Sequence, residues 1–323
     1  MTLHRRQLLH AAGAAGLGAA LPARAQPYPA RPVRLVVAAS AGTTVDVNAR
    51  FLSERLSARL QQGVLVDNRA GAGGGIGSDS VAKAPADGYT LLFGGVPHFT
   101  TRLMPDSALG YDPVKDFSAI AKVSSAALAL VVAADAPYKT MRELVRAMQA
   151  QPGEITGSSG GNGSSSHLCM VLMNDLTQTR TRHIPYKGNT PAITDVVGGQ
   201  CTFTWQGPSG VMQLVQAGKL RALAVSSRVR WESLPEVPTA HEMGATGMDM
   251  ASWMAFLGPA RLPGAVAQQL SAEIVRIAST PEYKEFCDKQ GMLVDVMGHE
   301  AWQAELPNEQ QKWKRIIALA QAQ

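Results

Sequence analysis

The chain has 323 residues and a formal net charge of +5 at pH 7. Three of the positive charges (Arg5, Arg6 and Arg24) precede residue 26 and no acidic residue accompanies them, so the remainder carries only +2. No run of lysine and arginine with interleaved aromatic residues occurs, which argues against binding to nucleic acid. At roughly 150 residues per domain, the length predicts two domains.

Residues 1–25 have the features of an export signal. The charged start is followed by an apolar stretch, Leu8 to Leu21, that is too short to span a membrane. Ala23-Arg24-Ala25 has the small-x-small form of a cleavage site. The arginine pair followed by Gln-Leu-Leu resembles a twin-arginine signal, but chance arginine pairs also occur in ordinary secretory signals. We therefore expect the mature chain to be soluble in a bacterial periplasm.

Cysteine and histidine patterns give no sign of a metal site. Cys169, Cys201 and Cys287 are scattered without C-x-x-C spacing, and neither H-x-x-x-H nor H-E-x-x-H occurs. We predict no metal and no cofactor. We expect buried thiols for at least one of the cysteines and leave a single disulfide open.

The first half of the chain alternates strands and helices. Val33–Ala38 predicts a largely buried strand, followed by a turn of small residues and a helix that reaches Leu60. Further strands are predicted at 63–67 and 89–94, and a short helix at 78–84, which together indicate a parallel, helix-covered sheet. Asp46, at the start of the first helix, either caps that helix or accepts hydrogen bonds from a ligand.

A second glycine-rich turn, residues 68–77, resembles a dinucleotide-binding loop only superficially. The fingerprint G-x-G-x-x-G that starts at Gly71 would need glycine at its last position, where Ile76 stands.

The second half continues the alternation. Thr140, with Glu143 three residues later, predicts a capping box that opens a helix to Ala150. A strand at 252–258 has a sequence that suits a return to the first half. The other predictions are strands at 128–133, 181–186, 201–205 and 220–225, and helices at 190–197, 263–278, 281–290 and 300–320.

The stretch from Gly157 to Leu168 is the most informative part of the sequence. It is rich in glycine and serine, and an apolar helical pattern follows from Leu168. Ser164, Ser165 or Ser166 would cap that helix. Because the first N–H groups of a helix lack intrahelical partners and carry partial positive charge, such a turn favours a carboxylate or a phosphate.

Three other interpretations of this stretch stay open. Glycine and serine are also typical of a flexible surface loop. A Walker A phosphate loop needs a lysine that is missing here. The pattern G-x-S-x-G would make Ser159 a nucleophile, with His183, His241 or His299 as its base, but residues 151–156 are too polar for the buried strand that this motif requires.

Motifs along the whole mature chain resemble the Bug-type periplasmic solute-binding proteins of tripartite tricarboxylate transporters. The motifs are Tyr28-Pro29 with Arg31-Pro32, 67–77, 82–91, 159–168, 185–188, 218–225 and 234–239. Their occurrence in this order is highly specific for the family.

The resemblance implies an α/β fold of the periplasmic binding protein type (type II-like). Two lobes, each a helix-covered mixed sheet, would be joined by two crossover strands. It assigns 26–128 plus 249–323 to one lobe and 129–248 to the other. It further implies a monomeric, non-enzymatic protein that delivers a small organic carboxylate to transporter membrane subunits. Docking of the loaded protein on a two-component receptor is the alternative.

The resemblance also implies the binding residues, one turn from each lobe. Loops near 187–189 and 205–207 would support the second turn. The implied residues are Ser40, Gly42, Thr43, Thr44 and Asp46 in the first lobe, and Ser159, Gly161, Asn162, Gly163, Ser164, His167, Trp205 and Gln206 in the second.

This sequence departs from the family pattern at both turns. Where relatives usually have Pro-Phe-x-x-Gly-Gly-x-x-Asp, Ala38, Ala39 and Thr43 replace the proline, the phenylalanine and the second glycine. Loss of the aromatic ring should enlarge that side of the pocket. Gln206 stands where many relatives have aspartate, so a ligand ammonium would lose a partner. We therefore expect a carboxylate without an amino group, with an aromatic body as one option. Trp205 is equally compatible with a place beside the ligand and a place in the core.

Overall fold

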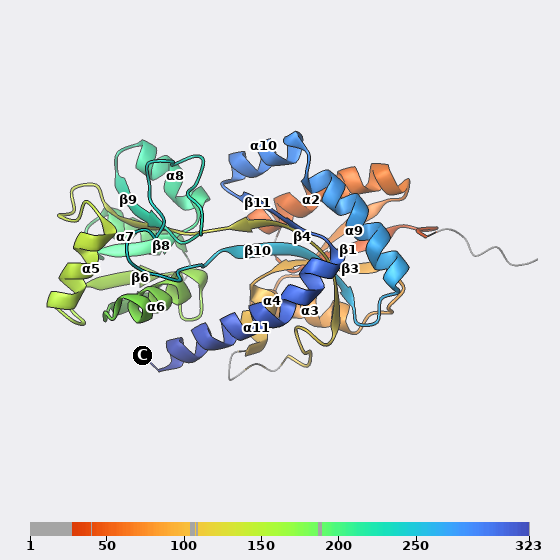
Figure 1. Cartoon of the computed structure of the whole chain (residues 1–323), viewed down its shortest axis with the longest axis horizontal. Helices are drawn as coiled ribbons and strands as arrows, with labels where there is room; N and C mark the ends of the chain where they lie inside the picture. The colour runs from red at the N-terminus through yellow and green to blue at the C-terminus, as the bar shows by residue number, and fades with distance from the viewer. Residues whose placement is uncertain (1–27, 40, 104–106, 108, 187–188, 323) are drawn as a thin grey trace, which may run out of the picture.

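The computed structural model describes residues 28–39, 41–103, 107, 109–186 and 189–322. Two α/β lobes lie side by side, each with a mixed sheet covered by helices (Figure 1). The expected fold class is confirmed. The predicted signal peptide, residues 1–25, lies outside the described residues.

The first lobe contains a six-stranded sheet in the order β11-β4-β10-β3-β1-β2. The first three strands along the chain are parallel, and β10 runs antiparallel to both β3 and β4. Its strands are β1 (Val33–Val37), β2 (Val64–Asn68), β3 (Thr90–Gly95), β4 (Phe117–Ala126), β10 (Ser252–Pro259) and β11 (Leu293–Met297).

Helices cover both faces of this sheet. Alternate residues of β1 divide between two cores, because successive side chains of a strand point to opposite faces. Leu35 belongs to the core that includes residues of α2 and α9, whereas Val36 belongs to the core that includes residues of α3, α4 and α11. The helical elements are α2 (Thr44–Leu60), the 3-10 turn η1 (Ala72–Gly74), α3 (Gly75–Ala82), α4 (Pro97–Leu103), α9 (Gly264–Ala278), α10 (Pro281–Gln290) and α11 (His299–Gln321).

The second lobe contains a five-stranded sheet in the order β7-β6-β8-β5-β9. β6 runs parallel to its neighbours β7 and β8, whereas β5 runs antiparallel to β8 and β9. Its elements are β5 (Ala129–Ala133), α5 (Met141–Ala150), β6 (Thr156–Ser159), α6 (Ser165–Thr177), β7 (Arg182–Pro185), α7 (Asn189–Val197), β8 (Phe203–Gln206), α8 (Pro208–Gln216) and β9 (Leu220–Val225).

The chain crosses between the lobes twice. It passes from β4 to β5 through only two residues, Ala127 and Leu128, and it returns to the first sheet at β10. These memberships support the proposed division into 26–128 plus 249–323 and 129–248. The C-terminal helix α11 adds a third link, because it packs on α4 in the first lobe and on α6 in the second (Figure 1).

Several elements escaped the sequence prediction: the strands β4, β6 and β11 and the short helices α4 and α8. The polar residues of β4 hide its strand character, but in the fold they have partners. Lys122 pairs with Asp295 at 2.9 Å, and Ser124 accepts a hydrogen bond from Asn48 at 2.9 Å. Tertiary contacts, rather than the local sequence pattern, therefore stabilise β4.

The three cysteines are free and buried. Cys169, Cys287 and Cys201 belong to three separate core clusters, so the fold keeps them apart. This agrees with the expectation of buried thiols. Among the described helices, none combines the length and the apolar character that crossing a bilayer requires.

Candidate functional site

The two sheets present their carboxyl ends to the crossover. In the first lobe, Gly95 at the end of β3 pairs with Met254 near the start of the returning strand β10. In the second lobe, Gln206 at the end of β8 pairs with Ala129, where the chain has just entered that lobe. Open α/β sheets bind ligands outside the carboxyl ends of their strands, so the region where these strand ends lie beside the crossover is the candidate site.

The first-lobe turn joins β1 to α2. Thr43 is the N-cap of α2, and its hydroxyl accepts from the N–H of Asp46 at 3.4 Å. Gly42 supports the turn with a φ of 80°, which favours glycine. Ser40, also predicted as a binding residue, lies outside the described residues.

Asp46 is directed into its own lobe and is only 2% exposed. One carboxylate oxygen accepts from the N–H of Gly42 at 2.8 Å and from Arg50 at 3.1 Å, and the other accepts from Asn68 at 2.8 Å. Burial alone would raise the pKa of Asp46, but these hydrogen bonds outweigh it and the net pKa lies below the usual value. The geometry favours the capping role for Asp46.

The second-lobe turn joins β6 to α6 and is bonded to itself. The N–H of Gly160 donates to the hydroxyl of Ser166 at 3.0 Å, and the N–H of Gly163 donates to Nδ1 of His167 at 3.1 Å. Ser164 is the N-cap of α6 and accepts from the N–H of His167 at 3.3 Å. Of the three serines that could have capped this helix, Ser164 does so.

Each turn leaves N–H groups at the start of its helix. No described residue accepts from the N–H groups of Thr44 and Val45 at the start of α2, or from those of Ser165 and Ser166 at the start of α6. Helix N-termini favour anions through these groups and through the helix dipole. The arrangement is suited to a carboxylate.

Ser159, the last residue of β6, contacts a histidine. Its hydroxyl lies 2.6 Å from Nε2 of His183 and also accepts from the N–H of Gly161 at 3.1 Å. The ring of His183 stacks on that of His167 at 4.2 Å between centroids. Burial, and then the neighbouring His167, lower the pKa of His183 to about 4.

This contact lacks two features that a serine hydrolase site requires. Ser159 has no exposed surface, and α6 begins only at Ser165, so the turn is not a sharp strand-to-helix elbow. No carboxylate among the described residues orients His183 as in a catalytic triad. The other two histidines, His241 and His299, bond to Gly247 and Ala119, away from this turn.

Two predicted residues of β8 are buried. Trp205 has no exposed surface and packs in the core that the two lobes share, which favours the core placement. Gln206 is 3% exposed and donates to the hydroxyl of Thr204 at 3.2 Å. Asn162, by contrast, is exposed at the tip of the second-lobe turn. Lys187 and Gly188 lie outside the described residues.

A cavity of about 330 Å³ lies beside the first-lobe turn, and most of its wall was not predicted. It combines Ala38 and Ala39 with the ends of β2 and β3 and the start of β10. The enlargement expected from Ala39 was the only signal for it in the sequence. Its lining residues are Ala38, Ala39, Val45, Ala70, Gly71, Gly74, Gly94, Gly95, Pro97, His98, Ser252, Trp253 and Met254.

A further cavity of about 350 Å³ adjoins the second-lobe turn and lies between Asn162, Gly163, His167 and His183 and the end of α11.

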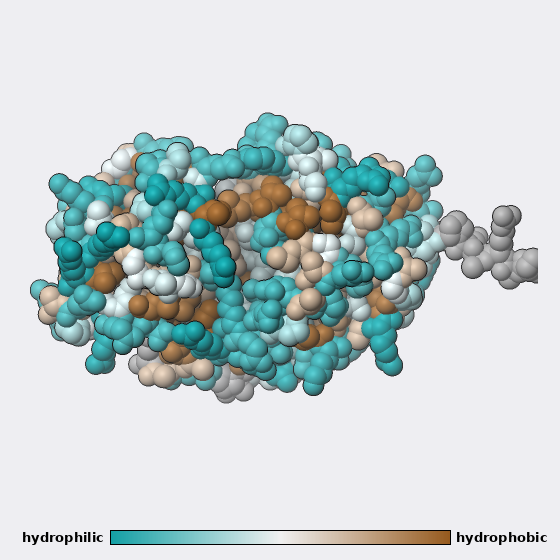
Figure 2. Space-filling model, viewed as in Figure 1, coloured by the Kyte–Doolittle hydropathy of each residue, from teal (hydrophilic) through white to brown (hydrophobic). Residues whose placement is uncertain are grey.

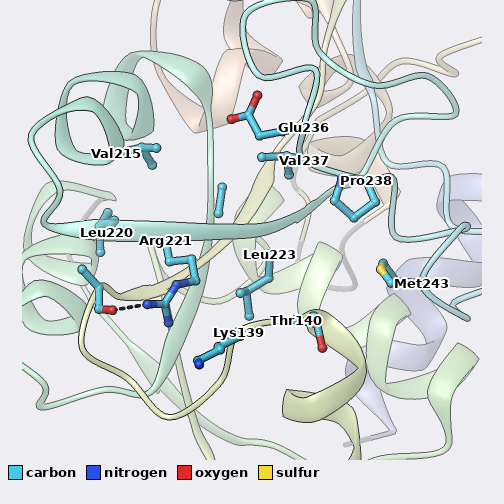
Figure 3. A pocket seen from close by; sticks show the side chains of 12 residues that line it. Lys139, Thr140, Val215, Leu220, Arg221, Leu223, Glu236, Val237, Pro238 and Met243 are labelled. Atoms are coloured by element: carbon cyan, nitrogen blue, oxygen red, sulfur yellow. Dashed lines mark hydrogen bonds between the residues drawn. The ribbon is translucent and has the colours of Figure 1, made fainter.

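Two other cavities lie away from these turns. One of about 430 Å³ is at the far end of the second sheet, where Leu220 pairs with Ala133 (Figure 3). Its Arg221 is already bonded to the carbonyl groups of Ala134, Ala136 and Tyr138. Another of about 430 Å³ adjoins β11, where hydrophobic residues gather between the lobes in Figure 2. Within the described part of the chain, no group of three potential metal ligands occurs.

Known proteins with similar sequences agree on one family. Residues 48–321 match the tripartite tricarboxylate transporter family receptor, TctC. Protein BugT of Bordetella pertussis is 32% identical over 303 residues, which cover 93% of this chain and 92% of BugT. A UPF0065 protein of Bordetella bronchiseptica is 38% identical over 259 residues, which cover 80% of this chain and 76% of that protein.

Solved structures give the same result. A TctC solute-binding protein from Polaromonas superposes with a TM-score of 0.79 at 28% identity, covering 90% of this chain and 99% of its own. Rpa4515 of R. palustris with adipate has a TM-score of 0.76 at 30% identity, covering 91% and 98%. MatC of Rhodopseudomonas palustris with bound malate has a TM-score of 0.72 at 25% identity, covering 90% and 100%. The chain therefore belongs to the tripartite tricarboxylate transporter receptor family, the Bug-type periplasmic solute-binding proteins.

Proposed function

We propose that this solute-binding protein captures a small organic carboxylate between its lobes and delivers it to the membrane subunits of a tripartite tricarboxylate-type transporter. The observation that carries the proposal is the pair of N–H groups of Ser165 and Ser166, from which no described residue accepts, at a helix start that faces the crossover. Adipate and malate, bound by two similar proteins, are both carboxylates. We further propose that the protein acts as a monomer without enzymatic activity and is exported to the periplasm.

In this proposal the residues of the second-lobe turn have two roles. Asn162, Ser164 and Ser165 lie beside the carboxylate. Ser159 and His167 hold the glycines of the turn in place through the bonds to Gly161 and Gly163. The first-lobe turn, with Gly42, Thr43 and Thr44, closes on the ligand from the other side.

A substitution at Ser165 tests the proposal sharply. Ser165 is exposed and is the first residue of α6, where proline is well tolerated. The preceding Ser164 already has the extended φ and ψ of −65° and 157° that proline requires of its neighbour. Ser165→Pro thus removes one N–H donor and keeps the helix, while Ser165→Ala is the matched control.

The measurement is calorimetric titration of the mature protein with the acids that raise its melting temperature in a screen of carboxylates, amino acids and amides. A charge-assisted hydrogen bond contributes about 1.5–3 kcal/mol, so Ser165→Pro should weaken binding at least tenfold. Ser165→Ala should bind within about twofold of the wild type. Equal affinity in both variants, or no carboxylate that binds, would refute the proposal.

Delivery to a transporter is tested in cells. Deleting the gene should abolish uptake of the radiolabelled carboxylate that binds best, and the wild-type gene should restore it. If uptake persists and only a transcriptional response to that carboxylate is lost, the protein serves a two-component receptor instead.

A further inference from the structure

The cavity of the first lobe lies where a bound ligand would extend. It is formed at the carboxyl ends of β1, β2 and β3, the three parallel strands of that lobe. No described residue of the second lobe lines it. A ligand whose carboxylate binds the second-lobe turn would therefore direct its other end toward this cavity when the lobes close.

The cavity wall has no charged side chain among the described residues. Its polar side chains are those of His98 and Ser252. Nε2 of His98 lies 2.8 Å from the carbonyl oxygen of Pro113, which makes Nε2 the N–H donor and is compatible with a neutral ring. The nearby charges of the first-lobe turn, Asp46 and Arg50, are paired with each other at 3.1 Å. Neither a second carboxylate nor an ammonium finds an ionic partner there.

The volume fits a ring. A cavity of about 150 Å³ lined by apolar side chains is large enough to bind benzene, and this one holds about 330 Å³. Trp253 adds an aromatic wall, and the half-buried Ala38 and Ala39 leave the space beside β1 open. A short unbranched chain would leave much of this volume unfilled.

We propose that the ligand is a monocarboxylate with an uncharged, ring-sized apolar body, and that this body occupies the first-lobe cavity. The inference rests on the proposed function and specifies its substrate class. The competing arrangement is a linear dicarboxylate whose second carboxylate binds the N–H groups of Thr44 and Val45 at the start of α2, from which no described residue accepts.

Calorimetric titration with benzoate, cyclohexanecarboxylate, adipate and malate separates these arrangements. The ring acids should bind the wild type at least tenfold more tightly than adipate or malate. Ala39→Phe fills the cavity and should weaken the ring acids at least tenfold. Val45→Arg places a cation at the wall and should weaken them similarly while it tightens adipate. Leu65→Arg, at a site 59% exposed in the same lobe, is the control and should change nothing.

Thr44→Pro provides an independent check, because it removes an N–H from the first position of α2 as Ser165→Pro does in α6. For the ring acids, Thr44→Pro should weaken binding less than Ser165→Pro does. Tighter binding of adipate than of the ring acids, with equal losses in the two proline variants, would overturn the inference and leave the proposed function intact. If no carboxylate binds, the proposed function itself fails. The wild-type ligand ranking decides the question even if a cavity variant does not fold.

Discussion

The two turns at the carboxyl ends of the sheets use their polar groups differently. In the second lobe, serine hydroxyls and a histidine nitrogen accept from the glycine N–H groups of the turn itself. In the first lobe, one buried carboxylate, Asp46, accepts hydrogen bonds from the turn, from the end of a neighbouring strand and from an arginine. The first turn then adjoins an apolar cavity, whereas the second has small polar residues up to its exposed tip.

This difference separates two tasks that a binding protein must perform. A carboxylate needs donors fixed in position before it arrives, and the self-bonded second turn supplies such rigidity. An apolar body needs space without unpaired charges, and the first lobe provides it because the acidic side chain of its turn is already satisfied. The predictions below test this division, from the largest expected effect to the smallest.

The largest expected effect is a loss of folding stability at low pH, because each lobe has a histidine with a pKa lowered to about 4. For His98, burial is the main cause, and the side chain is 2% exposed. Unfolded histidine takes up its proton near pH 6.5, whereas folded His98 does so only near pH 4. Stability is therefore fully present above pH 6.5 and is lost as the pH falls to 4, by about 3 kcal/mol for His98.

The measurement is the free energy of urea unfolding between pH 4 and pH 7. His98→Phe should flatten its pH dependence by close to one proton. His183→Gln should flatten it less, because His183 is only half-buried. An unchanged slope in His98→Phe would show that His98 is charged in the folded protein.

The next effect compares one buried polar side chain beside each turn. Asp46→Ala leaves three donors without their acceptor and should lower the free energy of unfolding by about 2–3 kcal/mol. Ser159→Ala removes a neutral hydroxyl from the end of β6 and should cost about 1 kcal/mol. Chemical denaturation of both variants provides the comparison. If Asp46→Ala were fully stable yet unable to bind ligand, Asp46 would face the ligand instead of its lobe.

The strand that leads into the second turn should tolerate no added methyl group. A Cβ at Gly157 would lie 2.5 Å from Sδ of Met170 and 2.8 Å from Cζ of Phe203. Gly157→Ala should therefore cost about 1–3 kcal/mol through overpacking. At Gly264, in the first turn of α9, a Cβ meets no atom within 4 Å, so Gly264→Ala is the control and should be neutral or slightly stabilising. Equal stability of the two variants would show that β6 is loosely packed.

The strand that leads into the second turn, β6, could not be predicted from the sequence. Thr156-Gly157-Ser158-Ser159 has no apolar side chain, yet it forms β6 because β7 and β8 pair with it on both sides. Neither partner is adjacent in sequence, so local pattern gave no sign of the strand. The helix after the turn was predictable, since its apolar spacing and its capping serine are local features.

The candidate site was predictable to a similar degree. The two turns and the cap at Ser164 follow from small residues placed before amphipathic helices. The bond between Ser159 and His183 and the buried state of Trp205 depend on which strands become neighbours, which a single sequence does not specify. The cavity was harder to predict from the sequence, because Ala39, Gly95 and Trp253 come from three segments that are distant along the chain.

The smallest effect concerns the two helix caps, and it distinguishes the turns most finely. Thr43 and Ser164 both accept an N–H bond as helix caps, at 3.4 Å and 3.3 Å, so Thr43→Ala and Ser164→Ala should each cost about 1 kcal/mol of stability. Their effects on binding should differ. The hydroxyl of Ser164 also lies 3.0 Å from that of Ser166, which in turn accepts from Gly160. Losing Ser164 therefore loosens the donors proposed to hold the carboxylate, and titration should show weaker binding in Ser164→Ala than in Thr43→Ala. Equal affinities would mean that the rigidity of the second turn does not depend on its chain of hydroxyl groups.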